Sequence, residues 1–159
     1  MRKIKFRGKR LANGEWVYGN LIAGTNDNGT EVAFISPGLP VVAEAYDLGG
    51  ATMYRVDPAT IGHFTGLTDK DGKEIYDGDI LLWTRKNVHI EGRQPQDLLY
   101  KCVVYYDNDK CAFQFRCELS CGACVGLLDF DDDRADESFV KVIGNVFDDP
   151  GLIEKGGAR

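Results

Sequence analysis

Three cysteines lie close together in the sequence, and their thiols could in principle bind a metal ion or form a redox pair. Cys117, Cys121 and Cys124 follow the spacing Cys-x3-Cys-x2-Cys, and Cys111 precedes them. Structural zinc takes four soft ligands in a tetrahedral set, but strong zinc motifs place two ligand pairs a dozen or more residues apart, and neither histidine of this chain is nearby. A redox pair of Cys121 and Cys124 would lack the βαβ setting that activates such thiols. We interpret these cysteines as inert residues of the core or of a sheet, since an odd total of five without a secretory leader also argues against a disulfide framework.

Two acidic clusters suggest a hard cation with oxygen ligands. In the first, Lys73 and Glu74 occupy positions five and six of an EF-hand loop counted from Asp69, where glycine is required at position six. In the second, residues 129–137, the aspartates do stand at positions one, three and five, but Arg134 replaces the required glycine. We interpret both clusters as turn formers and solvated acidic surface. The first cluster comprises Asp69, Asp71, Asp77 and Asp79.

His63 is the remaining candidate for acid–base or nucleophilic chemistry. A pair of carboxylates such as Asp77 and Asp79 acts as general acid and base only in a cleft that separates their pKa values. A Cys–His pair with His63 has no supporting hydrolase motif in the local sequence. Phosphate-binding loops, dinucleotide fingerprints, HExxH and GxSxG are absent. We therefore expect a protein that is not an enzyme and that holds no cofactor or metal.

The N-terminal ten residues carry the most distinctive charge pattern. Six of them are Lys or Arg and none is acidic, so residues 11–159 carry 13 basic and 25 acidic side chains, a balance of −12 against −6 for the whole chain. Four cations alternate along this stretch, near Trp16 and Tyr18 of the following segment. Cations with aromatic neighbours can neutralise phosphates and stack bases. The four cations are Lys3, Lys5, Arg7 and Lys9.

Two further roles compete with nucleic-acid binding for this basic segment. It suits a solvated edge strand whose lysines prevent unwanted sheet pairing, and the acidic remainder of the chain would repel nucleic acid. It also suits self-association, in which the basic segment of one subunit faces the acidic residues 129–137 of another. We favour a homo-oligomer that also binds another protein; nucleic acid stays an alternative, and no membrane contact is expected.

The elements that must position these residues are predicted to be short antiparallel strands. Gly and polar clusters interrupt the chain every eight to twelve residues, and the runs between them are rich in β-branched and aromatic residues. This pattern predicts a mainly β, barrel-like or sandwich body with little helix, and α+β as the alternative. With 159 residues and 43% hydrophobic content, we expect a single domain over 1–154 and a frayed tail at 155–159. The absence of an apolar leader or of a span of about 20 apolar residues predicts a cytoplasmic protein.

Several elements are specific enough to test. Residues 2–9 should form a strand that buries Ile4 and Phe6, followed by an Asn13-Gly14 turn and a return strand. The polar segment 84–98 is predicted to be a loop. Residues 101–106 and 111–116 should form a hairpin, and 139–147 a late strand.

Short segments should bend the chain between these strands. Asp71-Gly72 should form a tight turn, and Asp77-Gly78-Asp79 a second bend. Asp149 is expected to N-cap a short helical turn that begins at Pro150.

Four segments of the sequence together resemble the YopX family. They are MRKIKFRGKRLANGEWVYGNL, VDPATIGHFTGLTDKDGKEIYDGDILL, VVYYDNDKCAF and VKVIGNVFDDPGLI, in this order. The resemblance implies a phage or prophage origin, location in the bacterial host cytoplasm, a β-rich fold and self-association, without an established enzymatic activity. The protein partner that we expect would then be a host or phage protein. Residues 85–96 look like an enlarged loop relative to the family pattern. The cysteine cluster is not typical of the family, so any chemistry there would belong to this member alone.

Overall fold

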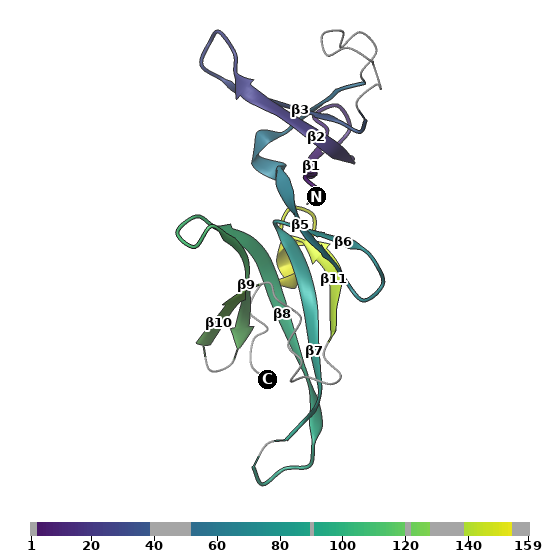
Figure 1. The fold of residues 1–159 in the computed structure, drawn as a ribbon, viewed down its shortest axis with the longest axis vertical. Helices are drawn as coiled ribbons and strands as arrows, with labels where there is room; N and C mark the ends of the chain where they lie inside the picture. The colour runs from purple at the N-terminus through teal and green to yellow at the C-terminus, as the bar shows by residue number, and fades with distance from the viewer. Residues whose placement is uncertain (1–2, 39–51, 90, 120–121, 128–138, 154–159) are drawn as a thin grey trace. The chain divides into compact units, whose positions relative to one another are not determined.

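The computed structural model describes residues 3–38, 52–89, 91–119, 122–127 and 139–153. These residues form a mainly β protein with two antiparallel sheets, which confirms the predicted fold class (Figure 1). The chain divides into two compact units, residues 1–66 and 67–159, and each is described by itself. The described elements are β1 (Phe6–Lys9), β2 (Trp16–Thr25), β3 (Glu31–Ser36), β4 (Tyr54–Val56), η1 (Pro58–Thr60), β5 (Gly62–Thr68), β6 (Glu74–Tyr76), β7 (Asp79–Val88), β8 (Gln96–Asp107), β9 (Ala112–Leu119), β10 (Gly122–Leu127), β11 (Phe139–Asn145) and η2 (Pro150–Leu152).

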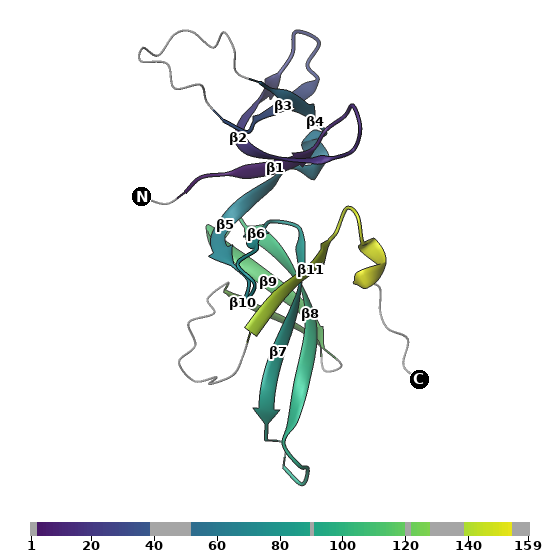
Figure 2. The same cartoon turned by 90° about the vertical axis from the view of Figure 1, so that its right-hand side faces the viewer.

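The first sheet has the strand order β4-β3-β2-β1-β5-β6, and its strands β1 to β4 with most of β5 make up the first unit, where the sheet is strongly curled. The predicted Asn13-Gly14 turn joins β1 to β2, with Gly14 at φ 73° and the Asn13 Oδ1 accepting a hydrogen bond from the Glu15 N–H. Beyond β1 the chain reaches the far strand, since Arg10 forms a bridge to Val56. The end of β1 therefore lies beside β4, the edge strand of the same sheet, so the sheet curls back on itself (Figure 2).

The core of the first unit lies on the concave side of this sheet. It consists of Val17, Ala33, Ile35 and Val56, all at most 7% exposed, with Phe6 packed against them. Phe6 therefore faces the core as predicted. Ile4, predicted to join it, is 66% exposed because β1 begins only at Phe6, so that part of the prediction is wrong.

Two glycines permit the close approaches that this curled sheet requires. A Cβ on Gly8 would lie 3.1 Å from Val56 Cβ. A Cβ on Gly19 would overlap the carbonyl oxygen of Ser36 on the neighbouring strand β3. Gly19 requires glycine because the Ser36 backbone leaves no room for a methyl group. At Gly8 a methyl group would fit only if the Val56 and Ile35 side chains moved by a few tenths of an ångström.

The second unit is built on a five-stranded sheet with the order β10-β9-β8-β7-β11. The β8–β9 hairpin confirms the prediction for 101–106 and 111–116, and its turn is held by Asp107 Oδ1, which accepts from the backbone N–H groups of Asp109 and Lys110. The loop predicted over 84–98 is confirmed only for its middle, since residues 89 and 91–95 lie outside the strands. It is wrong for both ends, because β7 continues to Val88 and β8 begins at Gln96, and these ends form an extended two-stranded ribbon (Figure 1). Its sequence is polar because a ribbon beyond the core has water on both faces.

The core of the second unit lies on one face of this sheet. Alternate residues of neighbouring strands stand opposite one another there, for example Leu81 opposite Cys102 and Val104 opposite Phe115. Trp83 borders this core and meets the Phe115 ring edge to face at 5.5 Å. The buried members are Ile75, Leu81, Cys102, Val104, Phe115, Cys117, Val140 and Val142.

The C-terminal segment confirms the late strand and corrects the cap. Strand β11 spans Phe139–Asn145 and a 3₁₀ turn begins at Pro150. Asp149 precedes that turn but its side chain does not cap it. Its Oδ2 instead accepts from the Asn145 N–H at 3.3 Å and fills the space beside Gly144, where a Cβ would lie 2.5 Å from the same oxygen.

Candidate basic and aromatic face of the N-terminal sheet

The cations of β1 and the aromatic residues of β2 lie on one face of the first sheet, which we call the basic–aromatic face. Side chains alternate along a strand, so positions 6 and 8 face the core. The cations at positions 5, 7 and 9 therefore point away from it. The antiparallel register places Lys9 opposite Trp16 and Arg7 opposite Tyr18. The face comprises Lys5, Arg7, Lys9, Trp16 and Tyr18.

Each cation of this face lies over an aromatic ring. The distance from the charged group to the ring centroid is 4.8 Å for Arg7 over Trp16, 5.6 Å for Lys9 over the same ring and 5.5 Å for Lys5 over Tyr18. Such contacts stabilise by about 0.5–1 kcal/mol at exposed sites and by more when water is excluded. The rings therefore order side chains that would otherwise be mobile.

Burial varies sharply along the strand. Lys3 is exposed, Lys5 and Lys9 are half-buried, and Arg7 is only 4% exposed. The backbone N–H of Lys9 donates to Thr60 Oγ1 at 2.9 Å, which ties β1 to η1. An arriving partner would thus meet the lysines and Tyr18, which is 40% exposed, before it met Arg7.

A further cation–aromatic pair extends beyond the four predicted cations. The Arg10 guanidinium lies 4.1 Å from the Tyr54 ring centroid and also pairs with Glu15 at 3.2 Å. Sequence reasoning missed this pair because Tyr54 lies on β4, and only the curling of the sheet brings that strand to Arg10. Lys3 similarly lies 6.0 Å from the Phe64 ring centroid.

His63 and the two candidate carboxylates fall in different units. His63 is half-buried on β5, where its ring stacks on Phe6 at 4.7 Å and 17°. Asp79 is 1% exposed and its Oδ2 accepts from the Tyr76 N–H at 2.8 Å, while Asp77 is half-buried in the same bend. Gly78 between them has φ 82°. Among the described residues, no group of three or more His, Cys, Asp or Glu side chains is arranged to hold a metal ion.

Asp69 serves as an anchor inside the second unit, a role that its sequence position did not reveal. Its Oδ1 accepts from the N–H groups of Asp71 and Lys73, which closes the β5–β6 turn around Gly72. Its Oδ2 accepts from the N–H of Val142 on β11 at 3.0 Å. Burial works to raise the pKa of Asp69, but these three backbone hydrogen bonds outweigh it and hold the pKa below 3.8.

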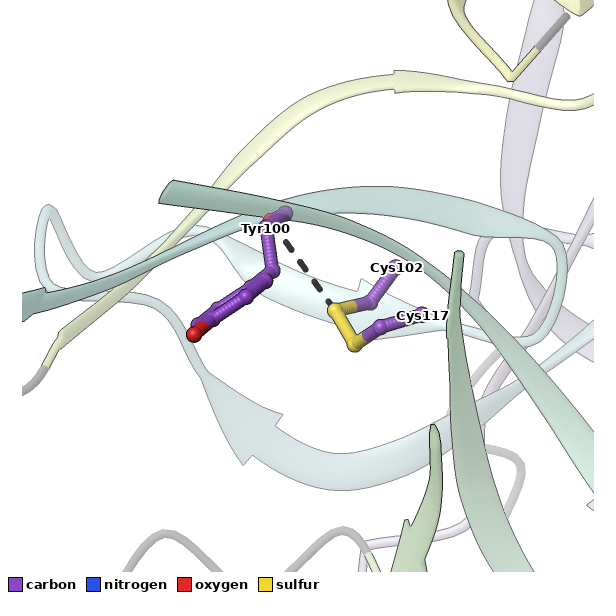
Figure 3. The surroundings of a disulfide bond; sticks show 3 residues. All are labelled: Tyr100, Cys102 and Cys117. Carbon is purple, nitrogen blue, oxygen red and sulfur yellow. Dashed lines mark hydrogen bonds between the residues drawn. A yellow bond between two sulfur atoms is a disulfide. The ribbon is translucent and has the colours of Figure 1, made fainter. Parts of the chain in front are cut away.

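One of the three clustered cysteines takes part in a disulfide. Cys117 is bonded to Cys102 in a disulfide across β8 and β9, with the Cα atoms 4.0 Å apart (Figure 3). Both residues are 1% exposed, in keeping with the predicted buried sheet position, whereas Cys111 is exposed. The sequence argument against disulfides is wrong for this pair. Cys124 lies on β10 opposite Cys117, and Cys121 is outside the described residues.

A signal for this disulfide was present in the sequence. Because the hairpin pairs Asp107 with Ala112, continuing the register outward places Cys102 opposite Cys117.

Residues 129–137, 155–159 and the segment 39–51 lie outside the described residues, so the expectations for them stay predictions. No helix among the described residues is long and apolar enough to cross a membrane.

Comparisons with known proteins identify the family to which this β architecture belongs. The fold is similar to the crystal structure of protein EF1440 from Enterococcus faecalis, with a TM-score of 0.51 and 21% sequence identity over 97% of this chain and all of that chain. A comparison with curated proteins finds no match. The model of the family described as YopX protein matches residues 5–154. The chain therefore belongs to the YopX family.

Proposed function

We propose that this protein is a non-enzymatic accessory module of a phage or prophage that works in the host cytoplasm by binding protein partners, including further copies of itself. The observation that carries this proposal is the basic–aromatic face in a chain whose remainder is strongly acidic. Opposite charges on separate parts of one chain favour contacts between chains. The acidic residues 129–137 supply an anionic segment of suitable charge.

The roles of the most distinctive polar residues support a binding module over an enzyme. Asp69, Asp79 and Asp149 each accept hydrogen bonds from backbone N–H groups. A carboxylate that is engaged in this way stabilises a turn and is poorly placed to transfer protons to a substrate. A structural role thus accounts for these aspartates, which lie in the segments that resemble the YopX family.

The composition of the face favours a protein partner over nucleic acid. Arg7 is nearly buried, so the strand presents lysines and a partly exposed Tyr18. The acidic remainder of the chain lowers affinity for a polyanion at a distance, whereas it supplies the complementary surface for another copy.

Sedimentation velocity at micromolar concentration tests self-association. We expect the wild-type protein to sediment as an oligomer at low salt and to shift toward monomer as salt screens the charges. Lys5→Gln with Lys9→Gln should give monomer at low salt. A matched control, Lys101→Gln with Lys110→Gln on the second sheet, should leave the oligomer unchanged. A monomer that is insensitive to salt would contradict the proposal.

Nucleic-acid binding is the second candidate, and the spacing of the cations favours it. Alternate residues of a strand lie about 6.8 Å apart, so Lys5 and Lys9 present charges at regular intervals beside Trp16 and Tyr18. Fluorescence anisotropy with labelled single-stranded DNA and RNA tests this candidate. Binding that persists after Lys3, Lys5, Arg7 and Lys9 are changed to Ser would exclude this face as the site, and loss of binding in that variant alone would support it.

A further inference from the structure

Three cysteines occupy one row across three neighbouring strands of the second sheet. The register places Cys102 on β8 opposite Cys117 on β9, and Cys117 opposite Cys124 on β10. Cys117 therefore has a cysteine as its direct neighbour on each side. Only one of these two pairs can be bonded at a time, and in this structure it is Cys102–Cys117.

The backbone geometry makes the second pair a suitable disulfide position. The Cα separation of 4.0 Å identifies Cys102 and Cys117 as a non-hydrogen-bonded antiparallel pair. Because the N–H and C=O of one residue point to the same side of a strand, those of Cys117 point toward β10. Cys117 and Cys124 then form a hydrogen-bonded pair with a Cα separation of about 5.5 Å. Disulfides usually join Cα atoms about 4.4–6.8 Å apart.

Solvent access favours attack on this disulfide from within the sheet. Cys102 and Cys117 are each 1% exposed, so a dissolved thiol does not reach their sulfur atoms in the folded protein. The register places Cys124 directly opposite Cys117 on the adjacent strand, so attack from this position needs no reagent from solution.

A released Cys102 would also find a hydrogen-bond acceptor. Its sulfur lies 3.9 Å from the carbonyl oxygen of Tyr100 (Figure 3). In the disulfide this sulfur has no hydrogen to donate, but a Cys102 thiol formed by exchange would have one.

We propose that Cys117 exchanges its disulfide partner between Cys102 and Cys124. The Cys124 thiolate attacks the sulfur of Cys117, the Cys117–Cys102 bond breaks, and a Cys117–Cys124 bond forms. Cys102 leaves as a thiolate and takes up the proton that Cys124 lost. One disulfide and one thiol are present before and after the step, so no oxidant or reductant is consumed.

Exchange would move a covalent link from one strand pair to the next. In one state β9 is joined to β8, in the middle of the sheet, and in the other it is joined to β10, the last strand of the sheet. The cysteine that carries the free thiol would change with the link. The row would thus be a thiol–disulfide exchange site within the second unit.

Acid quenching of the oxidised, folded protein, followed by unfolding in denaturant and alkylation with excess N-ethylmaleimide near pH 6, tests this exchange, because unfolding makes every free thiol accessible to the reagent. The full chain carries Cys111→Ser and Cys121→Ser, so that only the three cysteines of the row remain. After alkylation, trypsin separates peptide 102–110 from 117–134, and cleavage after Glu118 separates Cys117 from Cys124. We expect alkyl label on Cys102 together with a Cys117–Cys124 disulfide, beside the starting species. Label confined to Cys124 after prolonged incubation would overturn the proposal.

Two further variants separate exchange through Cys124 from release of Cys102 by another route. Adding Cys124→Ser should lower labelling of Cys102 at least roughly tenfold, because the internal nucleophile is gone. Equal labelling of Cys102 in this variant would show that the Cys102 thiol is released without Cys124 and would also overturn the proposal. In the protein with Cys102→Ala, glutathione disulfide should produce the Cys117–Cys124 bond, and an unchanged circular dichroism spectrum would show that the sheet is retained. Failure of that bond to form in the folded variant would count against the exchange.

Discussion

The two units use charged side chains in opposite ways. In the first unit, cations lie on the outer face of the sheet against aromatic rings, where Lys5 and Lys9 stay partly open to solvent. In the second unit, the carboxylates of Asp69 and Asp79 lie inside turns and accept backbone hydrogen bonds. A charge enclosed by backbone donors maintains the fold, whereas a charge held over an aromatic ring at the surface is ordered without being enclosed. The comparison separates residues that look alike in the sequence, where both groups appear only as charge clusters.

The largest effect should come from Asp69→Ala. The substitution leaves three backbone N–H groups without their acceptor, and we expect a loss of about 4 kcal/mol in the free energy of unfolding. Each unit contains one tryptophan, Trp16 or Trp83, so urea unfolding followed in Trp16→Phe and Trp83→Phe backgrounds reports on the units separately. The Trp83 signal should shift most. Asp71→Ala, at an exposed neighbour, is the control, and equal shifts from both substitutions would refute the anchoring role.

Gly19→Ala should produce the corresponding loss in the first unit. The added methyl group would overlap the Ser36 carbonyl oxygen, and we expect a loss of about 3 kcal/mol that appears mainly in the Trp16 signal. Gly24→Ala on the same strand is a matched control, because a Cβ there has no heavy atom within 4 Å. If both variants unfold at the same urea concentration, the close approach at Gly19 does not limit stability.

Acid should weaken the second unit through Asp69. The pKa of Asp69 in the folded protein lies below its value of 3.8 in the unfolded chain, so its stabilising contribution is fully present above that value. The contribution is lost as the pH falls from about 4 through the folded pKa. Thermal unfolding followed by Trp83 fluorescence should show this loss in the wild type. The loss should be smaller in Asp69→Ala, and an identical acid dependence in the two proteins would exclude Asp69 as its source.

Removing the surface lysines should have the smallest effect on stability. Lys5→Gln with Lys9→Gln removes two cation–π contacts at partly open sites, and we expect a loss of about 1 kcal/mol in total. The urea concentration at which the Trp16 fluorescence reports unfolding should fall slightly, and the one that Trp83 reports should stay fixed. A large loss of stability would mean that these lysines maintain the fold, and the contrast between the two units would then fail.

The sequence predicted the strands with clear alternation and the turns built on glycine, because both depend on local patterns. It therefore anticipated the Asp71-Gly72 and Gly78 turns and the β8–β9 hairpin. It did not reveal the burial of Arg7 or the bond between Asp69 and Val142, since these depend on how distant segments pack. The predicted loop over 84–98 was too long, with its ends in β7 and β8, because polarity alone cannot separate a solvated strand from a turn.

The contact between the β5–β6 turn and β11 also bears on aggregation. Strand β11 ends the second sheet, and an open strand edge recruits further strands from other molecules. Here the Val142 N–H donates to Asp69 and the Val140 carbonyl accepts from the Lys70 N–H at 3.1 Å. The turn thus occupies outward-facing backbone groups of the edge strand, and a molecule that lost this turn in acid would expose a template for fibril growth.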